Sequence, residues 1–307
     1  MDPKQPRSFF HWTGQTVGGI LPSVMNDELK KAIKLIKAGS EITGAAVGGA
    51  LSGILSGPIG GAAGSVLGYV LTKTIGDIAC RVLSKRERAK IGAASYYAIE
   101  AIKKRVDEGA PPRKEWFAST KKQTSTAEEL FENILLVGKS EHEEKKLKLL
   151  GILFANIAFH PFMSKEDANL QIRRVEELSY RQICMLAAIA HRDHGDTDQF
   201  SDLKAGEALN IIHKNKQDAR DAMTLLQEAF EMYLKALIEF YSEGRYLEPT
   251  SWKKLVPAEF QLSIEGTALL QLIDWIDSIE KEDWYKVAQL LKYRIPKDPR
   301  AIDLRSD

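Results

Sequence analysis

The chain has 307 residues, enough for about two domains of ~150 residues, each with a buried core. Its 43 Lys and Arg residues balance 42 Asp and Glu residues, so no overall charge excess directs it toward nucleic acid or acidic substrates. A hydrophobic share of 44% with 28% charged residues excludes a largely disordered chain and a polytopic membrane protein. Cys80 and Cys184 are too few for a disulfide framework, which indicates a reducing, intracellular setting.

Residues 1–41 form an N-terminal segment without the basic and apolar pattern of a secretion signal, and we expect no such signal there. An aromatic cluster at 9–12 is expected to pack on the chain's own surface or, alternatively, at a lipid boundary, where aromatic rings concentrate.

The most unusual segment is 42–72, where thirty-one consecutive residues carry no charge and nine are glycine. The glycines alternate with Ala, Val, Leu and Ile, a composition that excludes a flexible polar linker. Residues four apart lie on one face of a helix, so glycines at this spacing predict stripes where two helices can approach closely, as in lipid. The two sets are Gly49, Gly53, Gly57 and Gly61, and Gly60, Gly64 and Gly68.

Pro58 divides this segment into a predicted helical hairpin with arms at 42–56 and 59–83. At ~1.5 Å per residue the first arm reaches only ~22 Å, whereas the hydrocarbon core of a bilayer is ~30 Å thick. We therefore expect a re-entrant hairpin, or one that inserts on oligomerisation. A soluble hairpin buried in a helical bundle and a glycine-rich ligand loop are the alternatives, although no phosphate-binding glycine motif occurs.

Basic residues flank the hairpin. From 81 to 122, twelve Lys and Arg residues face five Asp and Glu residues. Such clusters attract anionic lipid and favour an arrangement in which both ends of the hairpin stay cytoplasmic. We expect the protein at the cytoplasmic face of the inner membrane, with lipid contacts from Lys85, Arg86, Arg88 and Lys90.

The middle of the chain predicts helices. Ser84 and Glu87 form a capping box that begins a helix to about residue 106, so that 42–108 comprises the hairpin and a basic helix. A proline-containing linker is predicted over 109–125. A helical region over 126–178 follows, starting at a capping box of Thr126 and Glu129.

Residues 179–292 predict helices at 179–191, 204–213 and 217–239, a hairpin near Gly244, and strand-like alternation at 260–266 before a last helix. This order, with Leu262, Ser263 and Gly266, resembles winged-helix modules. Between 193 and 243 five basic residues face eleven acidic ones, which disfavours binding to phosphates. We expect protein docking through an acidic module, rather than nucleic-acid binding or a plain helical bundle; 293–307 is a tail.

Candidate chemistry is sparse. His191 and His194 lie among Asp193, Asp196 and Asp198, a group of side chains that can bind a divalent metal but matches no metal-binding signature; the alternative is a solvated loop. The HRD triplet at 191–193 lacks the other kinase motifs. The sequence indicates neither an enzyme nor a cofactor.

The predicted fold is mainly α: a glycine-rich helical hairpin and helical body, with a C-terminal winged-helix-like α+β module. In architecture, the glycine-striped hairpin with basic flanks resembles glycine-zipper pore formers and colicin-like hydrophobic hairpins. With the acidic module it is similar to bacterial membrane-disrupting effectors of antiphage abortive infection. The resemblance implies a homo-oligomer that permeabilises the inner membrane. The alternative is a soluble helical scaffold or protein-docking module that uses the hairpin as an oligomer interface and its basic stretch to contact an acidic partner, such as the chain's own C-terminal module.

Overall fold

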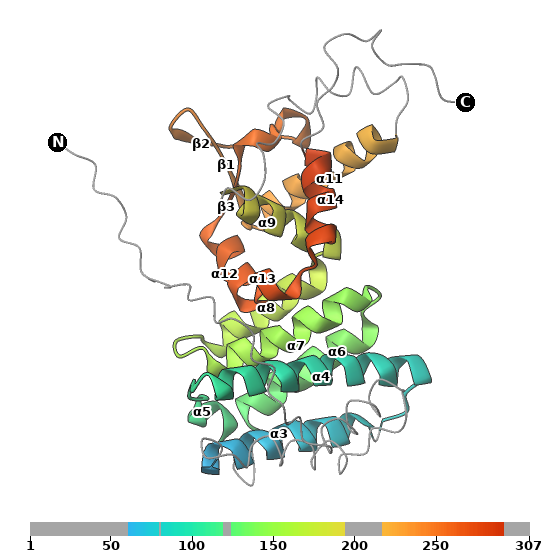
Figure 1. Ribbon diagram of the computed structural model, residues 1–307, viewed down its shortest axis with the longest axis vertical. Coiled ribbons are helices and arrows are strands. Elements are labelled where there is room, and N and C mark those ends of the chain that lie inside the picture. Colours follow the sequence, from blue (N-terminus) through green and yellow to red (C-terminus); the bar gives the residue numbers. More distant parts are fainter. Residues whose placement is uncertain (1–60, 80, 119–123, 194–216, 292–307) are drawn as a thin grey trace, which may run out of the picture.

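The computed structural model describes residues 61–79, 81–118, 124–193 and 217–291. These residues are mainly helical, as predicted, with one small sheet near the C-terminus. Figure 1 shows two parts: a helical body of α3 to α8, and a C-terminal module of α9 to α14 with the sheet. The predicted first hairpin arm at 42–56 and the predicted helix at 204–213 lie outside the described residues.

The body is built around α7, which is buried along most of its length. Helix α4 lies across α7 at a small-residue crossing, where an ideal Cβ on Gly151 would lie 2.6 Å from both Ala94 O and Ala98 N. The rings of Phe131 and Phe154 join α6 to α7, with centroids 4.6 Å apart. The body helices are α3 (Gly61–Ala79), α4 (Lys85–Asp107), α5 (Lys114–Phe117), α6 (Thr126–Ser140), α7 (Glu144–Phe159) and α8 (Lys165–Glu177).

The start of α4 is confirmed, because Ser84 and Glu87 form the reciprocal bonds of a capping box. The second box begins one residue earlier than predicted, with Ser125 and Glu128. Helix α5 lies within the predicted linker 109–125, and its Trp116 and Phe117 are buried in the same core as α4 and α7. The regions 42–108 and 126–178 therefore contribute helices to one body.

The C-terminal module places a three-stranded antiparallel sheet, in the order β2-β1-β3, after its second described helix. In the hairpin, Tyr241 pairs with Tyr246, and on the other side of β1 Phe240 pairs with Phe260. The elements are α9 (Tyr180–Asp193), α11 (Gln217–Leu234), β1 (Ile238–Ser242), β2 (Arg245–Leu247), two 3-10 turns (Trp252–Lys254 and Pro257–Glu259), β3 (Phe260–Leu262), α12 (Ile264–Leu272), α13 (Trp275–Ser278) and α14 (Lys281–Leu291).

Helix α11 ends earlier than the predicted residue 239. Ala236 adopts a left-handed conformation with φ 56°, and Leu237 N donates to Met232 O at 2.9 Å. This pattern closes a helix and usually uses glycine. Because alanine, not glycine, occupies this position, nothing in the sequence marks the helix end, and the predicted helix extends to 239. In the structure Leu237 already leads into β1.

Candidate functional site: α3 and its contacts with the body

Helix α3 is the predicted second arm of the glycine hairpin, and it is helical over Gly61–Ala79. Its aliphatic face is buried against the body, with contacts to α5 and α6. An amphipathic helix contributes most of its stability through such a face. The buried residues are Leu67, Val70, Leu71, Thr74, Ile75 and Ile78.

The structure describes part of the predicted glycine stripes. Gly61, Gly64 and Gly68 lie on α3, and Gly68 is half-buried beside the exposed side chain of Tyr69. Gly76 lies about two turns after Gly68 on the same side of α3 and is also half-buried. Gly49, Gly53, Gly57 and Gly60 lie outside the described residues.

A buried carboxylate ties α3 to the body. Lys73 Nζ donates to Glu128 Oε1 at 3.0 Å, and the Glu128 side chain is 4% exposed. This hydrogen bond raises the pKa of Lys73. Because Glu128 also caps α6 by accepting from Ser125 N at 3.1 Å, one side chain satisfies both the helix start and the α3 contact. Arg81 pairs with Glu132 one turn further along α6.

The predicted lipid-contacting cluster is divided by the structure. Arg86 is exposed and Arg88 half-buried. Lys90, however, is 8% exposed, and its Nζ faces Lys139 O at 3.5 Å. In this structure the charge of Lys90 therefore lies at the end of α6, and lipid contact by Lys90 stays a prediction. Lys85 is the first residue of α4, and the structure describes its backbone but not its side chain.

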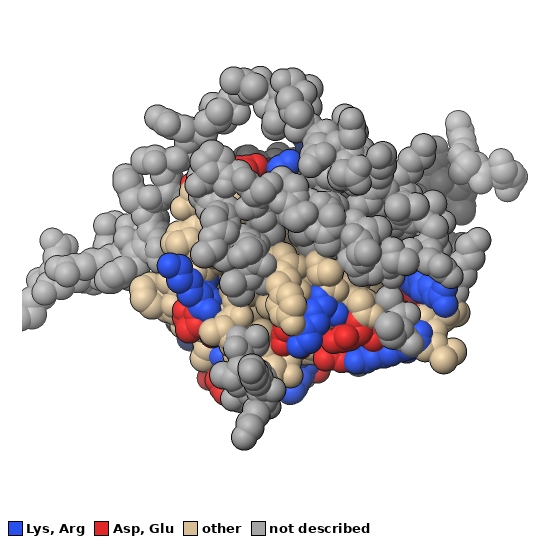
Figure 2. Space-filling model, turned by 90° about the horizontal axis from the view of Figure 1, so that it is seen from below, with Lys and Arg blue, Asp and Glu red and all other residues tan. Residues whose placement is uncertain are grey.

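The turn between α3 and α4 exposes an apolar side chain among these arginines: Val82 is fully exposed. Leu136 of α6 is also partly exposed, one turn beyond Glu132. Figure 2 views the molecule from the α3 end and shows basic and acidic groups interspersed on the described part of that face. The pairs of Arg81 with Glu132 and Lys139 with Glu87 contribute to this mixture. Arg86 and Arg88 have no ion-pair partner within the described ranges.

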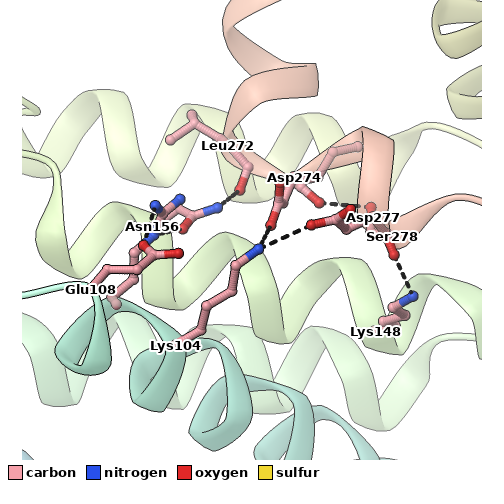
Figure 3. A network of polar contacts seen from close by, with 10 residues as sticks. Lys104, Glu108, Lys148, Asn156, Leu272, Asp274, Asp277 and Ser278 are labelled. Carbon is pink, nitrogen blue, oxygen red and sulfur yellow. Dashed lines mark hydrogen bonds and ion pairs between the residues drawn. The ribbon is translucent and has the colours of Figure 1, made fainter. Parts of the chain in front are cut away.

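The body and the C-terminal module meet at a polar network (Figure 3). Lys104 Nζ lies 3.0 Å from a carboxylate oxygen of Asp274 and 3.0 Å from one of Asp277. Asn156, which is 8% exposed, donates to Leu272 O at 2.7 Å and accepts from Arg105 Nε at 2.9 Å. The acidic module thus contacts the basic helix α4 within the same chain.

The histidine of the predicted metal group lies in an aromatic cluster. The ring of His191 stacks on Trp284 with centroids 3.8 Å apart and meets Trp275 edge-on at 4.7 Å. The described part of the chain contains no group of three or more side chains able to hold a metal ion. Asp196 and Asp198 of the predicted group lie outside that part, so metal binding by His191 stays a prediction. His194 lies outside the described residues.

The rest of the HRD triplet is structural. Arg192 donates to Pro257 O at 3.4 Å and to Phe260 O, so it fastens the approach to β3 onto α9. Cys184 is buried, which raises the pKa of its thiol to about 12 and keeps it protonated.

Sequence reasoning missed one cleft in the module. It has a volume of about 490 Å³ and lies between the β1–β2 hairpin and residues 254–259. It is lined by the buried side chains of Phe240, Leu255 and Val256, and by Arg245, Lys254 and three glutamates. The size and mixed lining suit a small ligand or a peptide side chain.

Among the described residues, no helix is both long and apolar enough to cross a membrane. Comparisons with protein-family models, curated proteins and solved structures found no match.

Proposed function

We propose that the chain is a membrane-associating, oligomerising effector that binds anionic lipid at the cytoplasmic face of the inner membrane and permeabilises it. The observation that carries the proposal is the uncharged glycine run of 42–72, which continues into helix α3. Gly64, Gly68 and Gly76 lie along one side of α3, which we call the glycine flank, and Gly68 and Gly76 are half-buried. Nine glycines in helices would cost several kcal/mol, at about 1 kcal/mol each. Close helix packing, in an oligomer or in lipid, offsets such a cost.

The described residues support a peripheral first contact. Val82 offers an exposed apolar side chain, and Arg86 and Arg88, which have no ion-pair partner among the described residues, offer charges that attract anionic headgroups. Tyr69 on α3 is 59% exposed and amphipathic, which suits the boundary between water and lipid. The aliphatic face of α3 stays on the body in this contact, while residues near Gly64 and Gly68 meet a second copy.

The second candidate is a soluble scaffold that uses the same glycine flank as an oligomer interface. The docking of α3 on α5 and α6, with the Lys73–Glu128 pair, favours it. Both candidates require the glycine flank for assembly, but only the effector perturbs a bilayer. An antiviral role follows from the resemblance to abortive-infection effectors and belongs to the first candidate.

We expect the purified full chain to release dye from vesicles of phosphatidylcholine and phosphatidylglycerol, and Gly64→Leu/Gly68→Leu to abolish both release and assembly. Two leucines would hold neighbouring helices apart, whereas small side chains permit close approach. The matched control is Gly64→Ala/Gly68→Ala, which keeps the flank small and should retain most of the release. Thermal unfolding of each variant checks that the body is intact.

Assembly without release by a folded wild-type protein would contradict the effector and support the scaffold. Release that is equal in the leucine and alanine variants would contradict the role of the glycine flank.

A further inference from the structure

Most of the described ion pairs that cross from the body to the C-terminal module share one polarity: the body supplies cations and the module supplies carboxylates. Within the described ranges one pair runs the other way, Lys235 with Glu177 at 2.5 Å. The pairs of the common polarity are Lys104 with Asp274 and Asp277 at 3.0 Å each, Lys145 with Asp283, and Arg174 with Glu265 at 2.5 Å.

The module also presents backbone oxygens to the same face. Lys148 Nζ donates to Asp277 O at 3.1 Å, beside the carboxylates that contact Lys104. Asp274 begins α13 in a left-handed conformation with φ 51°, so the short turn at 272–277 directs its oxygens toward the body. Four body cations therefore contact acceptors that lie between residues 265 and 283 of the module.

Only part of this junction is open to solvent, since the side chains of Arg174 and Asp283 are just 12% and 17% exposed. The side chains of Lys104 and Lys145 are 48% and 54% exposed, and that of Asp277 is 67% exposed. Ion pairs at such exposure are individually weak and are screened by salt. The apolar attachment at this junction comes from α12, which packs on α7. The polar contacts can thus exchange partners while the α7–α12 contact persists as a pivot.

We infer that Lys104, Lys145, Lys148 and Arg174 form an anion-binding face that the module occupies in this state, and that an anionic bilayer surface displaces the module from it. This inference rests on the proposed function, and it adds a regulatory step: the module shields part of the basic body until lipid headgroups compete. A bilayer suits the face because its mobile phosphates can meet several spaced cations at once.

Hydrogen exchange on the full chain tests this step, with the amides of 273–279, beyond the α7–α12 contact, as reporters. Phosphatidylcholine vesicles containing phosphatidylglycerol should increase exchange several-fold at these amides, and vesicles of phosphatidylcholine alone should not. The variant Asp274→Asn/Asp277→Asn should show the increase without lipid, since asparagine also tolerates the left-handed conformation but gives Lys104 no charge. Glu243→Gln/Glu248→Gln is the matched control, because it changes the net charge of the module equally at residues without an ion pair among those described.

Wild-type protein that binds anionic vesicles with unchanged exchange at the junction would overturn the inference and leave the proposed function standing. An Asn variant that matches the Gln control would also overturn it. Wild-type protein that binds no anionic vesicle would instead remove the proposed function, and this inference with it.

Discussion

Gly151→Ala is expected to destabilise the body by about 3 kcal/mol, the upper part of the range for overpacked cores. The new Cβ would lie 2.6 Å from two backbone atoms of α4, Ala94 O and Ala98 N, and 2.8 Å from Tyr97 Cβ. Backbone atoms inside a helix cannot rotate away, so α4 and α7 must separate along their crossing. Urea unfolding followed by circular dichroism measures the loss.

Gly138→Ala provides the matched control. Its Cβ would also face Ala94, but at 3.4 Å from Ala94 Cβ and 3.5 Å from a methyl of Leu147, which is ordinary contact or close to it. Alanine gains about 1 kcal/mol of helix propensity over glycine, so this variant should be neutral or stabilised. Equal unfolding midpoints for the Gly138 and Gly151 variants would contradict the close crossing of α4 and α7.

Gly266→Ala is expected to be at least as damaging, with a loss of about 3 kcal/mol or more. Its Cβ would lie 2.0 Å from Leu237 O, in the turn between α11 and β1. Ser263, the N-cap residue of α12, is bonded to the same turn. Its Oγ donates to Ala236 O at 2.6 Å and accepts from Gly266 N at 2.9 Å. Moving α12 away from Leu237 would therefore break the cap of α12 as well. Urea unfolding, with hydrogen exchange at 237–240, measures both effects.

Gly244→Ala separates crowding from backbone conformation. Gly244 has φ 81° and open space around its Cβ position, so alanine there should cost about 1–2 kcal/mol through the left-handed conformation alone. A Gly266 variant no less stable than the Gly244 variant would contradict the contact with Leu237.

Local signals in the sequence predicted much of the fold. Ser84 and Glu87 begin α4, because a serine and a glutamate three residues apart satisfy the free amides of a helix start. The turn at Gly244 and the alternation from Phe260 predicted strands, and the structure confirms the hairpin and a strand over Phe260–Leu262. The rest of the predicted 260–266 alternation belongs to the start of α12 at Ile264. Capping depends on residues close in the chain, so sequence spacing alone reveals it.

Contacts between distant segments were less predictable. Gly151 and Gly266 are isolated glycines without periodicity, and their role depends on backbone atoms of α4 and of the α11–β1 turn. Lys90 belongs to a basic run, but the end of α6 lies over it. His191 precedes acidic residues in sequence, whereas its ring faces two tryptophans of later helices.

The predicted pairing of the basic stretch with an acidic partner, for which the chain's own module was one candidate, has a counterpart in the contacts of Lys104 with Asp274 and Asp277. The acidic excess counted in the sequence covers 193–243, whereas Asp274 and Asp277 lie beyond it, so the particular partners required the turn geometry at the start of α13. The glycine run was read correctly as helical over α3, and its aliphatic residues, which sequence hydropathy cannot assign to lipid or protein, lie against α5 and α6.

The most direct measurement is flotation of the purified full chain with vesicles on a density gradient, at physiological ionic strength. Membrane association through α3, Val82 and the neighbouring arginines predicts that the protein rises with phosphatidylglycerol-containing vesicles and stays at the bottom with phosphatidylcholine alone. A folded protein that stays at the bottom with both kinds of vesicle would contradict it.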